Sequence, residues 1–200
     1  MKHAENIKQV LELGPDYMGF IFYNKSPRYV GEQWDGPGRD FPLTTKKVGV
    51  FVNESLQTIR LLADRYQFDY LQLHGHETPE YCRELRQDNF TLIKAVALNE
   101  DDDFNTLEDY QPWIKYFLFD TPSNQFGGTG STFDWSVLKE YDHEVPFFLG
   151  GGISLNNIRE VQKLNELNLH AIDVNSRFET RPGWKDPVML ENLKNQIQEL

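Results

Sequence analysis

Residues 1–23, MKHAENIKQVLELGPDYMGFIFY, combine a helix and a strand in an order that decides the fold. From Ile7 to Leu13 apolar residues recur at close to helical spacing, and the pattern ends at a glycine-proline pair. Residues 16–23 then form a short, nearly continuous apolar run, which is typical of a strand buried on both faces. The sequence therefore begins with a helix that has no strand before it.

The alternation of strand and helix continues through the rest of the chain. Further predicted strands lie at 46–53 (KKVGVFVN), 69–75 (DYLQLHG), 91–98 (TLIKAVAL), 115–120 (KYFLFD), 146–152 (PFFLGGG) and 170–176 (HAIDVNS). Each is followed by a helical pattern or by a segment long enough for a helix, which implies a parallel sheet with crossover helices. Seven strands and eight helical segments fit a TIM (β/α)8 barrel without its first β-strand, whereas an open doubly wound sheet gives no reason to begin with a helix. We therefore expect residues 1–200 to form one α/β barrel domain that is truncated at its N-terminus.

Composition and charge restrict the class of protein. With 39% hydrophobic and 26% charged residues, the chain has the composition of a globular domain. A net charge of -11 repels polyanions, so nucleic acid is not an expected partner. No apolar run reaches the ~20 residues of a membrane span, and no leader peptide is visible. Cys82, the single cysteine, excludes an internal disulfide, and we expect a cytoplasmic protein that does not contact membranes.

Active sites of such barrels lie at the carboxyl ends of the strands, so residues just after each strand are candidates. Arg28 follows the first visible strand in NKSPRYV and can clamp a carboxylate through its planar fork, unless it is a solvated loop arginine. His74 in LQLHG can bind substrate or transfer protons, or can instead cap the following helix. A metal site is not expected there, because no third ligand follows at a recognisable spacing.

The stretch FLFDTPSNQFGGTGSTFDW (117–135) carries the main candidate for proton transfer. Asp120 ends an apolar strand and is expected to point its carboxyl into the mouth of the barrel, where it can act as a general acid. Capping of a helix N-terminus is the competing role. The GGTG segment that contains Gly128 follows, and its glycines allow a loop to cover a ligand or to approach it closely.

Two loops, LGGGIS (149–154) and DVNSRFE (173–179), follow the last two predicted strands. Barrels often bind phosphate at this position, through backbone N–H groups and the N-terminus of a short helix. Glycines permit close approach of the backbone, and amide and hydroxyl side chains can donate hydrogen bonds. The two loops together predict a phosphate site. The residues that suit it are Gly150, Gly151, Gly152, Asn175 and Ser176.

These stretches, together with GFIFYNKSPRYV, VGVFVN and TRPGWKD, resemble in sequence and order the phosphoribosylanthranilate isomerases of tryptophan biosynthesis. The resemblance covers nearly the whole chain. It implies an Amadori rearrangement that converts N-(5-phosphoribosyl)anthranilate into 1-(2-carboxyphenylamino)-1-deoxyribulose 5-phosphate. The implied substrate is a small molecule that carries a phosphate and a carboxylate, and the implied reaction uses neither a metal nor an organic cofactor.

The resemblance also implies roles for individual residues. Asp120 matches the general acid that protonates the ribose ring oxygen and opens the ring to a Schiff base. Arg28 matches the residue that holds the anthranilate carboxylate, and His74 lies in the matching substrate-facing stretch. The phosphate site is matched by the glycine loop and by residues 173–177, which begin with Asp173.

The chain departs from the family pattern in two places. Arg177 stands where the family usually has the glycine of a Ser-Ser-Gly sequence. Family members also begin with a strand ending in Lys-x-Cys-Gly, whose cysteine is the general base, and Met1 aligns just after that motif. We therefore expect the strand and the base to be absent, turnover to fall by ~10²–10⁴-fold, and the coding sequence upstream of Met1 to contain the motif. Cys82, expected to be half-buried on an outer helix, does not suit the role of the base.

Two other functions fit parts of the pattern. A non-catalytic barrel that binds phosphate ligands would retain Asp120, Arg28 and the glycine loops without the base. Another ribose-phosphate barrel enzyme, such as an indole-glycerol-phosphate synthase, predicts lysines at strand ends. Lys25 and Lys94 are the candidates for such lysines, but the FGGTGSTFDW stretch argues against this reading. The sequence is compatible with a monomer or a homodimer.

Overall fold

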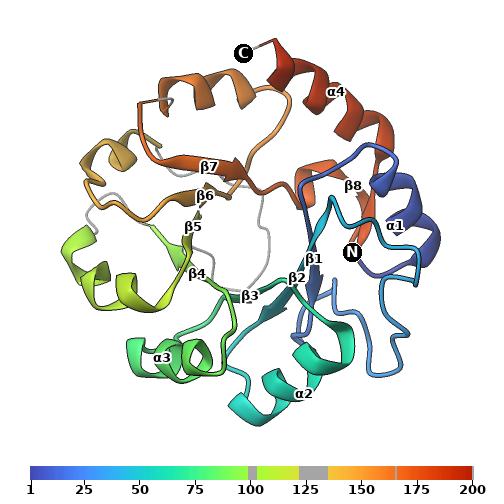
Figure 1. Cartoon of the computed structure of the whole chain (residues 1–200). Coiled ribbons are helices and arrows are strands. Elements are labelled where there is room, and N and C mark those ends of the chain that lie inside the picture. The colour runs from blue at the N-terminus through green and yellow to red at the C-terminus, as the bar shows by residue number, and fades with distance from the viewer. Residues whose placement is uncertain (99–102, 122–134, 165, 200) are drawn as a thin grey trace.

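The computed structural model describes residues 1–98, 103–121, 135–164 and 166–199. Seven parallel strands pair in the order of the sequence, and Figure 1 shows the sheet curling around a common centre with the helices outside it. The strands are β1 (Tyr17–Ile21), β2 (Lys46–Phe51), β3 (Tyr70–Leu73), β4 (Leu92–Ala97), β5 (Tyr116–Asp120), β6 (Phe147–Leu149) and β7 (Leu169–Ile172). The α/β fold is therefore TIM-barrel-like.

The helices that cover the sheet are of two kinds. The α-helices are α1 (Ala4–Leu11), α2 (Leu56–Tyr66), α3 (Pro79–Gln87) and α4 (Pro187–Gln198). The 3₁₀ helices are η1 (Phe104–Trp113), η2 (Trp135–Glu140), η3 (Ile158–Leu164) and η4 (Ser176–Phe178). Side-chain oxygens of Ser55, Thr78 and Asp186 accept backbone N–H bonds at the starts of α2, α3 and α4. Among the described helices, none has the length and apolar character needed to cross a bilayer.

Two connections differ from the regular alternation of strand and α-helix. Residues 22–45, between β1 and β2, form an irregular segment without a helix. The segment after β4 forms the 3₁₀ helix η1, in which Pro112 lacks the N–H that an α-helix requires. Asp103 also bonds to the backbone N–H of Asn105 and to the hydroxyl of Thr106, a local pattern that competes with α-helical hydrogen bonding.

One hairpin was not predicted. Strands β8 (Glu179–Arg181) and β9 (Trp184–Lys185) pair in antiparallel fashion, with Glu179 opposite Lys185. The turn between them contains a proline-glycine pair, and Gly183 has a φ of +82°, in the left-handed region that glycine favours. The hairpin brings two charged residues together behind the carboxyl end of β7.

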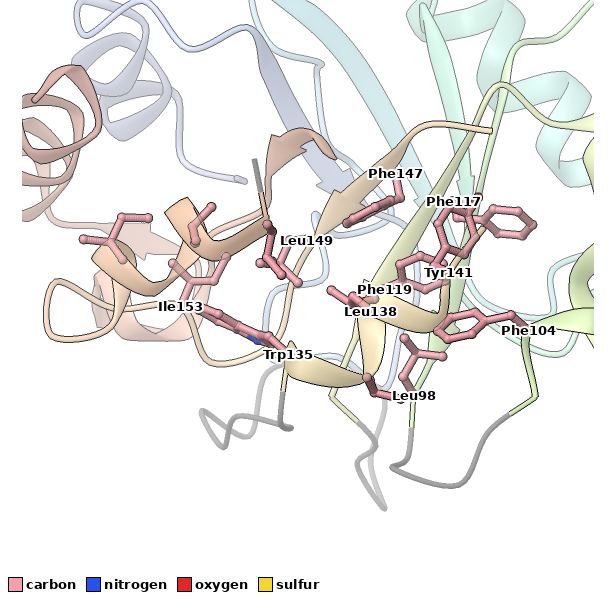
Figure 2. Close-up of a cluster of buried hydrophobic side chains, with 14 of the residues drawn as sticks. Leu98, Phe104, Phe117, Phe119, Trp135, Leu138, Tyr141, Phe147, Leu149 and Ile153 are labelled. Carbon is pink, nitrogen blue, oxygen red and sulfur yellow. The ribbon is translucent and has the colours of Figure 1, made fainter. Parts of the chain in front are cut away.

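Alternate strand residues face the outer helices and the interior of the barrel. On β5 and β6, Phe117, Phe119 and Phe147 are fully buried on the outer side. Figure 2 shows these rings packed with Leu138 and Tyr141, from η2 and the residue that follows it. This layer fixes β5 and β6 against their crossover segments, and it therefore fixes the position of the strand end that carries Asp120.

The amino-terminal end of the barrel interior is filled by four rings from alternate strands. Tyr17 of β1, Tyr70 of β3, Tyr116 of β5 and His170 of β7 form a closed set of contacts. The centroid distances around the set are 5.6, 6.0, 4.3 and 5.8 Å. Four residues from alternate strands are the usual composition of a layer in such barrels. The Tyr17 hydroxyl lies 2.7 Å from Nε2 of His170, so side chains join the two ends of the sheet.

Candidate active site

A cavity of about 820 Å³ occupies the interior of the barrel and reaches the carboxyl ends of the strands. It also extends along the space between β1 and β7, where Gly19 and Ile172 form part of its wall. Most of the predicted site residues line this cavity, although they come from separate segments of the chain. They are His74, Asp120, Gly151, Gly152, Asp173, Asn175 and Ser176. Gly128 lies outside the described residues.

Asp120 and His74 face each other across the cavity. Nε2 of His74 lies 3.4 Å from Oδ2 of Asp120, and Nδ1 lies 2.7 Å from the side-chain nitrogen of Gln72. With the Gln72 amide as donor, Nδ1 is the acceptor and the ring proton is on Nε2, which faces Asp120. Thr121 donates its backbone N–H to the other carboxylate oxygen. Since Thr78 caps α3, the alternative role of His74 as a helix cap is wrong.

Gly151 allows the loop after β6 to lie directly against the end of β5. Its φ is +75°, and a Cβ atom at this position would lie 2.6 Å from the backbone nitrogen of Thr121. The same atom would lie 3.1 Å from Oδ1 of Asp120. A side chain at position 151 would therefore displace the carboxylate or the loop. The glycine is required for close approach to Asp120 as well as for its backbone conformation.

Asp173 extends from the end of β7 into the same cavity. Burial raises the pKa of its carboxyl, and the negative charge of Asp120 raises it further. Lys185, His74 and the amino group of Met1 oppose these effects without reversing them. Asp173 is nevertheless exposed to solvent, and solvent screening limits the rise in its pKa. A proton on Asp173 would reduce the negative charge beside the predicted phosphate loops.

Arg28 is buried, with 6% of its surface exposed, and does not line the cavity. Its Nε and Nη2 atoms donate to Glu179, at 2.9 and 2.7 Å from Oε2. The alternative that Arg28 is a solvated loop residue is therefore wrong. Sequence reasoning missed this partner because residues 28 and 179 are far apart in the chain.

Lys185 is a further residue that the sequence did not single out. Its ammonium lines the cavity and donates to Oδ1 of Asn175 at 2.6 Å and to Oε1 of Glu179 at 2.9 Å. Burial opposes ionisation of Glu179, but hydrogen bonds from Arg28 and Lys185 outweigh it, so the pKa of Glu179 is lowered. Burial lowers the pKa of Lys185 despite the nearby carboxylates. The proline-glycine turn in TRPGWKD is the only sequence signal that could have placed these two charges opposite each other.

The remaining candidates lie away from the cavity. Cys82 is completely buried in α3, not half-buried as expected, and burial raises the pKa of its thiol to about 12. Lys94 is held by Glu77 and by the carbonyl of Gly75 behind the cavity wall, and Lys25 is exposed. In the described part of the chain, no group of three or more His, Cys, Asp or Glu side chains could hold a metal ion.

A family model for N-(5'-phosphoribosyl)anthranilate isomerase matches residues 1–196. The chain belongs to this isomerase family. The isomerase of Parabacteroides distasonis is 41% identical over 204 residues, which cover 100% of this chain and 90% of the relative. The isomerase of Phocaeicola vulgatus is 36% identical, with 100% and 95% covered. These matches confirm the resemblance found in the sequence motifs.

Solved structures of the isomerase family share the fold. The phosphoribosylanthranilate isomerase of Thermotoga maritima superposes with a TM-score of 0.86 at 32% identity, over 100% of this chain and 96% of that one. A family structure in complex with reduced 1-(o-carboxyphenylamino)-1-deoxyribulose 5-phosphate superposes with a TM-score of 0.83 at 30% identity, with the same coverage. The isomerase family therefore agrees with this chain in both sequence and fold.

Proposed function

We propose that this protein is a phosphoribosylanthranilate isomerase of tryptophan biosynthesis. It converts N-(5-phosphoribosyl)anthranilate into 1-(2-carboxyphenylamino)-1-deoxyribulose 5-phosphate by an internal oxidation and reduction. The observation that carries the proposal is the family match over residues 1–196. The cavity supports it, because the polar residues at the ends of β3, β5 and β7 meet in one space.

Asp120 is proposed as the general acid. In its protonated form it gives a proton to the ribose ring oxygen, the bond from C1' to that oxygen breaks, and the anthranilate nitrogen forms a Schiff base with C1'. Loss of the C2' proton then gives an enolamine, and the ketone forms when C1' gains a proton and the C2' hydroxyl loses one. His74, whose Nε2 lies 3.4 Å from Asp120, is positioned to stabilise the carboxylate that remains. Gly151 holds the neighbouring loop against this acid.

The phosphate end of the substrate is assigned to the cavity, and the carboxylate end to Arg28, which is buried beside Glu179 and lies outside the cavity lining. The phosphate is proposed to bind between the loops after β6 and β7, at Gly151, Gly152, Asn175 and Ser176, with Gly128 in the preceding loop. Asp173 begins the second of these loops and is proposed to lie beside the bound phosphate. The carboxylate is proposed to bind Arg28, whose guanidinium fork suits it geometrically.

The barrel is further proposed to accommodate an eighth parallel strand between β1 and β7. Alternate strands β1, β3, β5 and β7 supply a complete layer of four rings. The other described strands, β2, β4 and β6, supply Val48, Ile93 and Phe148, which are three residues of a layer that would take four. No backbone pair links β1 to β7 in the described sheet, and the cavity extends along this seam. By the family resemblance, this strand precedes α1 and ends in the cysteine that removes the C2' proton.

The experiment compares the 200-residue chain with a version that carries an apolar strand ending in Cys-Gly ahead of Met1. Product formation from N-(5-phosphoribosyl)anthranilate is measured by chromatography. We expect the extended version to turn over ~10²–10⁴-fold faster, the usual contribution of a positioned base. A third version with Ser in place of the added cysteine separates the base from the strand. Equal rates for all three would reject the proposed base, and no product from any would reject the isomerase assignment.

A non-catalytic barrel that binds phosphate ligands is the second candidate. The feature that favours it is the retention of Asp120, Gly151 and Asn175 in a cavity where none of the described lining residues is assigned as the base. It predicts binding of the product without turnover by either version. A synthase of the indole-glycerol-phosphate type is disfavoured, because neither Lys25 nor Lys94 lines the cavity.

Location and assembly are also proposals. A cytoplasmic location is supported by the free thiol of Cys82, which suits a reducing compartment. A solved structure of the Thermotoga maritima isomerase describes monomers generated from a dimeric protein. We propose a monomer or a homodimer for this chain, which size-exclusion chromatography with light scattering would distinguish.

A further inference from the structure

We propose that Lys185 and Glu179 are positioning residues that orient the anion-binding side chains Asn175 and Arg28. The four side chains form one continuous set of contacts. Arg28 donates to Glu179, Lys185 donates to Glu179 and also to Asn175, and the distances lie between 2.6 and 3.0 Å. This inference rests on the proposed function, in which Asn175 binds the phosphate and Arg28 binds the carboxylate.

Lys185 determines which way the Asn175 amide points. An ammonium group only donates hydrogen bonds, so the atom of Asn175 that lies 2.6 Å from it must be the amide oxygen. The amide NH2 must then point away from Lys185. Among the described residues, none accepts a hydrogen bond from this NH2, and Asn175 does not cap η4. Because Asn175 lines the cavity, its two N–H donors remain available to an anion there.

Glu179 determines the orientation of Arg28 in a similar way. Its carboxylate engages Nε and Nη2, the inner edge of the guanidinium group. No hydrogen bond from Nη1 reaches a described residue, so the outer edge of the fork keeps donors, although Arg28 is 6% exposed and lies outside the cavity lining. Glu179 also accepts from the backbone N–H of Gly183 and from Lys185. With both oxygens occupied and a lowered pKa, Glu179 remains ionised and does not transfer protons itself.

The backbone around Lys185 is fixed independently. Asn6 of α1 is completely buried, and its amide forms two hydrogen bonds with the main chain of Lys185. Oδ1 accepts from the backbone N–H at 2.7 Å and Nδ2 donates to the carbonyl at 2.8 Å. The hairpin register then places Glu179 opposite Lys185. A rigid backbone with a buried charge pair is what a positioning role requires.

The test is a double-mutant cycle on ligand binding, so it does not depend on turnover. Lys185→Met removes the ammonium at similar length, Asn175→Ala removes the amide, and a third variant carries both changes. The ligands are reduced 1-(o-carboxyphenylamino)-1-deoxyribulose 5-phosphate and the same compound without its phosphate, measured by titration calorimetry. Lys163→Met is the matched control, because its ammonium is exposed and pairs with the likewise exposed Glu160 on η3.

We expect each single change to weaken binding of the phosphorylated ligand by about tenfold, the usual scale for one charge-assisted hydrogen bond. The double change should weaken it by little more than either single change, because the two residues act as one unit. Binding of the ligand without phosphate should be unaffected, and Lys185→Arg should recover most of the loss. If Lys185→Met does not fold, Lys185→Gln takes its place in the cycle.

Two results would distinguish failure of the positioning role from failure of the proposed function. If the unaltered chain does not bind the phosphorylated ligand, the proposed function fails, and this inference fails with it. If the unaltered chain binds but the two changes are additive, or weaken both ligands equally, the positioning role fails and the proposed function survives. Glu179→Gln provides the corresponding measurement for Arg28. It should weaken the ligand that carries a carboxylate more than its decarboxylated analogue, and equal losses would contradict the proposed role of Glu179.

Discussion

His74 and Asp120 are brought within 3.4 Å of each other although they end strands β3 and β5, with β4 between them. The contact is possible because the sheet curls, so that side chains at the ends of alternate strands converge on the axis of the barrel. At this distance the imidazole ring of His74 can stabilise the carboxylate that Asp120 becomes once it has given up a proton.

Asp120→Asn is expected to lower turnover by more than ~10²-fold in the version that carries the added strand ending in Cys-Gly. The amide cannot donate a proton to the ring oxygen as a carboxylic acid does. Affinity for the product analogue should change far less, since the amide retains the shape of the carboxyl. Steady-state kinetics and calorimetry together give the two quantities. Equal losses in turnover and in affinity would contradict a general-acid role.

Arg28→Ala is expected to destabilise the protein as well as to weaken binding of the carboxylate end. It leaves the carboxylate of Glu179 buried beside Lys185 alone, and loss of one partner of a buried pair costs about 3–5 kcal/mol. The free energy of unfolding is measured by urea denaturation. Arg60→Ala is the control, because Arg60 forms an exposed pair with Asp88 that should contribute only about 0–1 kcal/mol. Similar losses for the two variants would show that the buried pair has no special role.

Asp173→Asn is expected to raise the free energy of unfolding at neutral pH. The pKa of Asp173 is raised in the folded state, so its ionised form lowers stability at any pH above that value. The penalty disappears as the pH falls below the unfolded value of about 3.9. Urea midpoints should therefore differ between variant and parent at neutral pH and converge in acid. Asp40→Asn is the control, because Asp40 lies on the exposed loop before β2. Its urea midpoint should equal that of the parent protein at neutral pH as well as in acid.

Gly151→Ala is expected to reduce both stability and turnover. The left-handed backbone alone disfavours alanine by about 1–2 kcal/mol, and the added Cβ would also contact Thr121 and Asp120. Gly14→Ala is a matched control, since Gly14 has a similar φ of +68° but no atom within 4 Å of its would-be Cβ. The difference between the two variants in urea denaturation isolates the close approach. No difference would mean that the loop can move away from Asp120 without cost.

The cavity residues at strand ends were predictable from the sequence. His74, Asp120, Asn175 and the glycines each follow an apolar run, and parallel strands place all such positions at one end of a barrel. Once the runs were identified as strands, the convergence of these residues followed from topology. Their distances did not, because those depend on the curvature of the whole sheet.

The contacts of Arg28, Glu179 and Lys185 were not predictable in the same way. Arg28 and Glu179 are 151 residues apart, and no local pattern records which carboxylate an arginine will meet. The hairpin that carries Glu179 and Lys185 is too short for an alternation of apolar and polar residues to be visible. The 3₁₀ form of η1 is favoured by Pro112 and by the hydrogen bonds that the side chain and the carbonyl of Asp103 accept, and the spacing of apolar residues does not reveal these features.

The ring of Tyr17, Tyr70, Tyr116 and His170 has a consequence for the order of folding. The hydrogen bond between Tyr17 and His170 spans 153 residues, whereas each pair of neighbouring strands is joined by a much shorter connection. Contacts of such long separation carry the largest loop-closure entropy, so we expect the two ends of the sheet to meet late in folding. By the same reasoning the seam between β1 and β7 should open first under stress, and amide hydrogens of these two strands should exchange with solvent before those of β3 and β4.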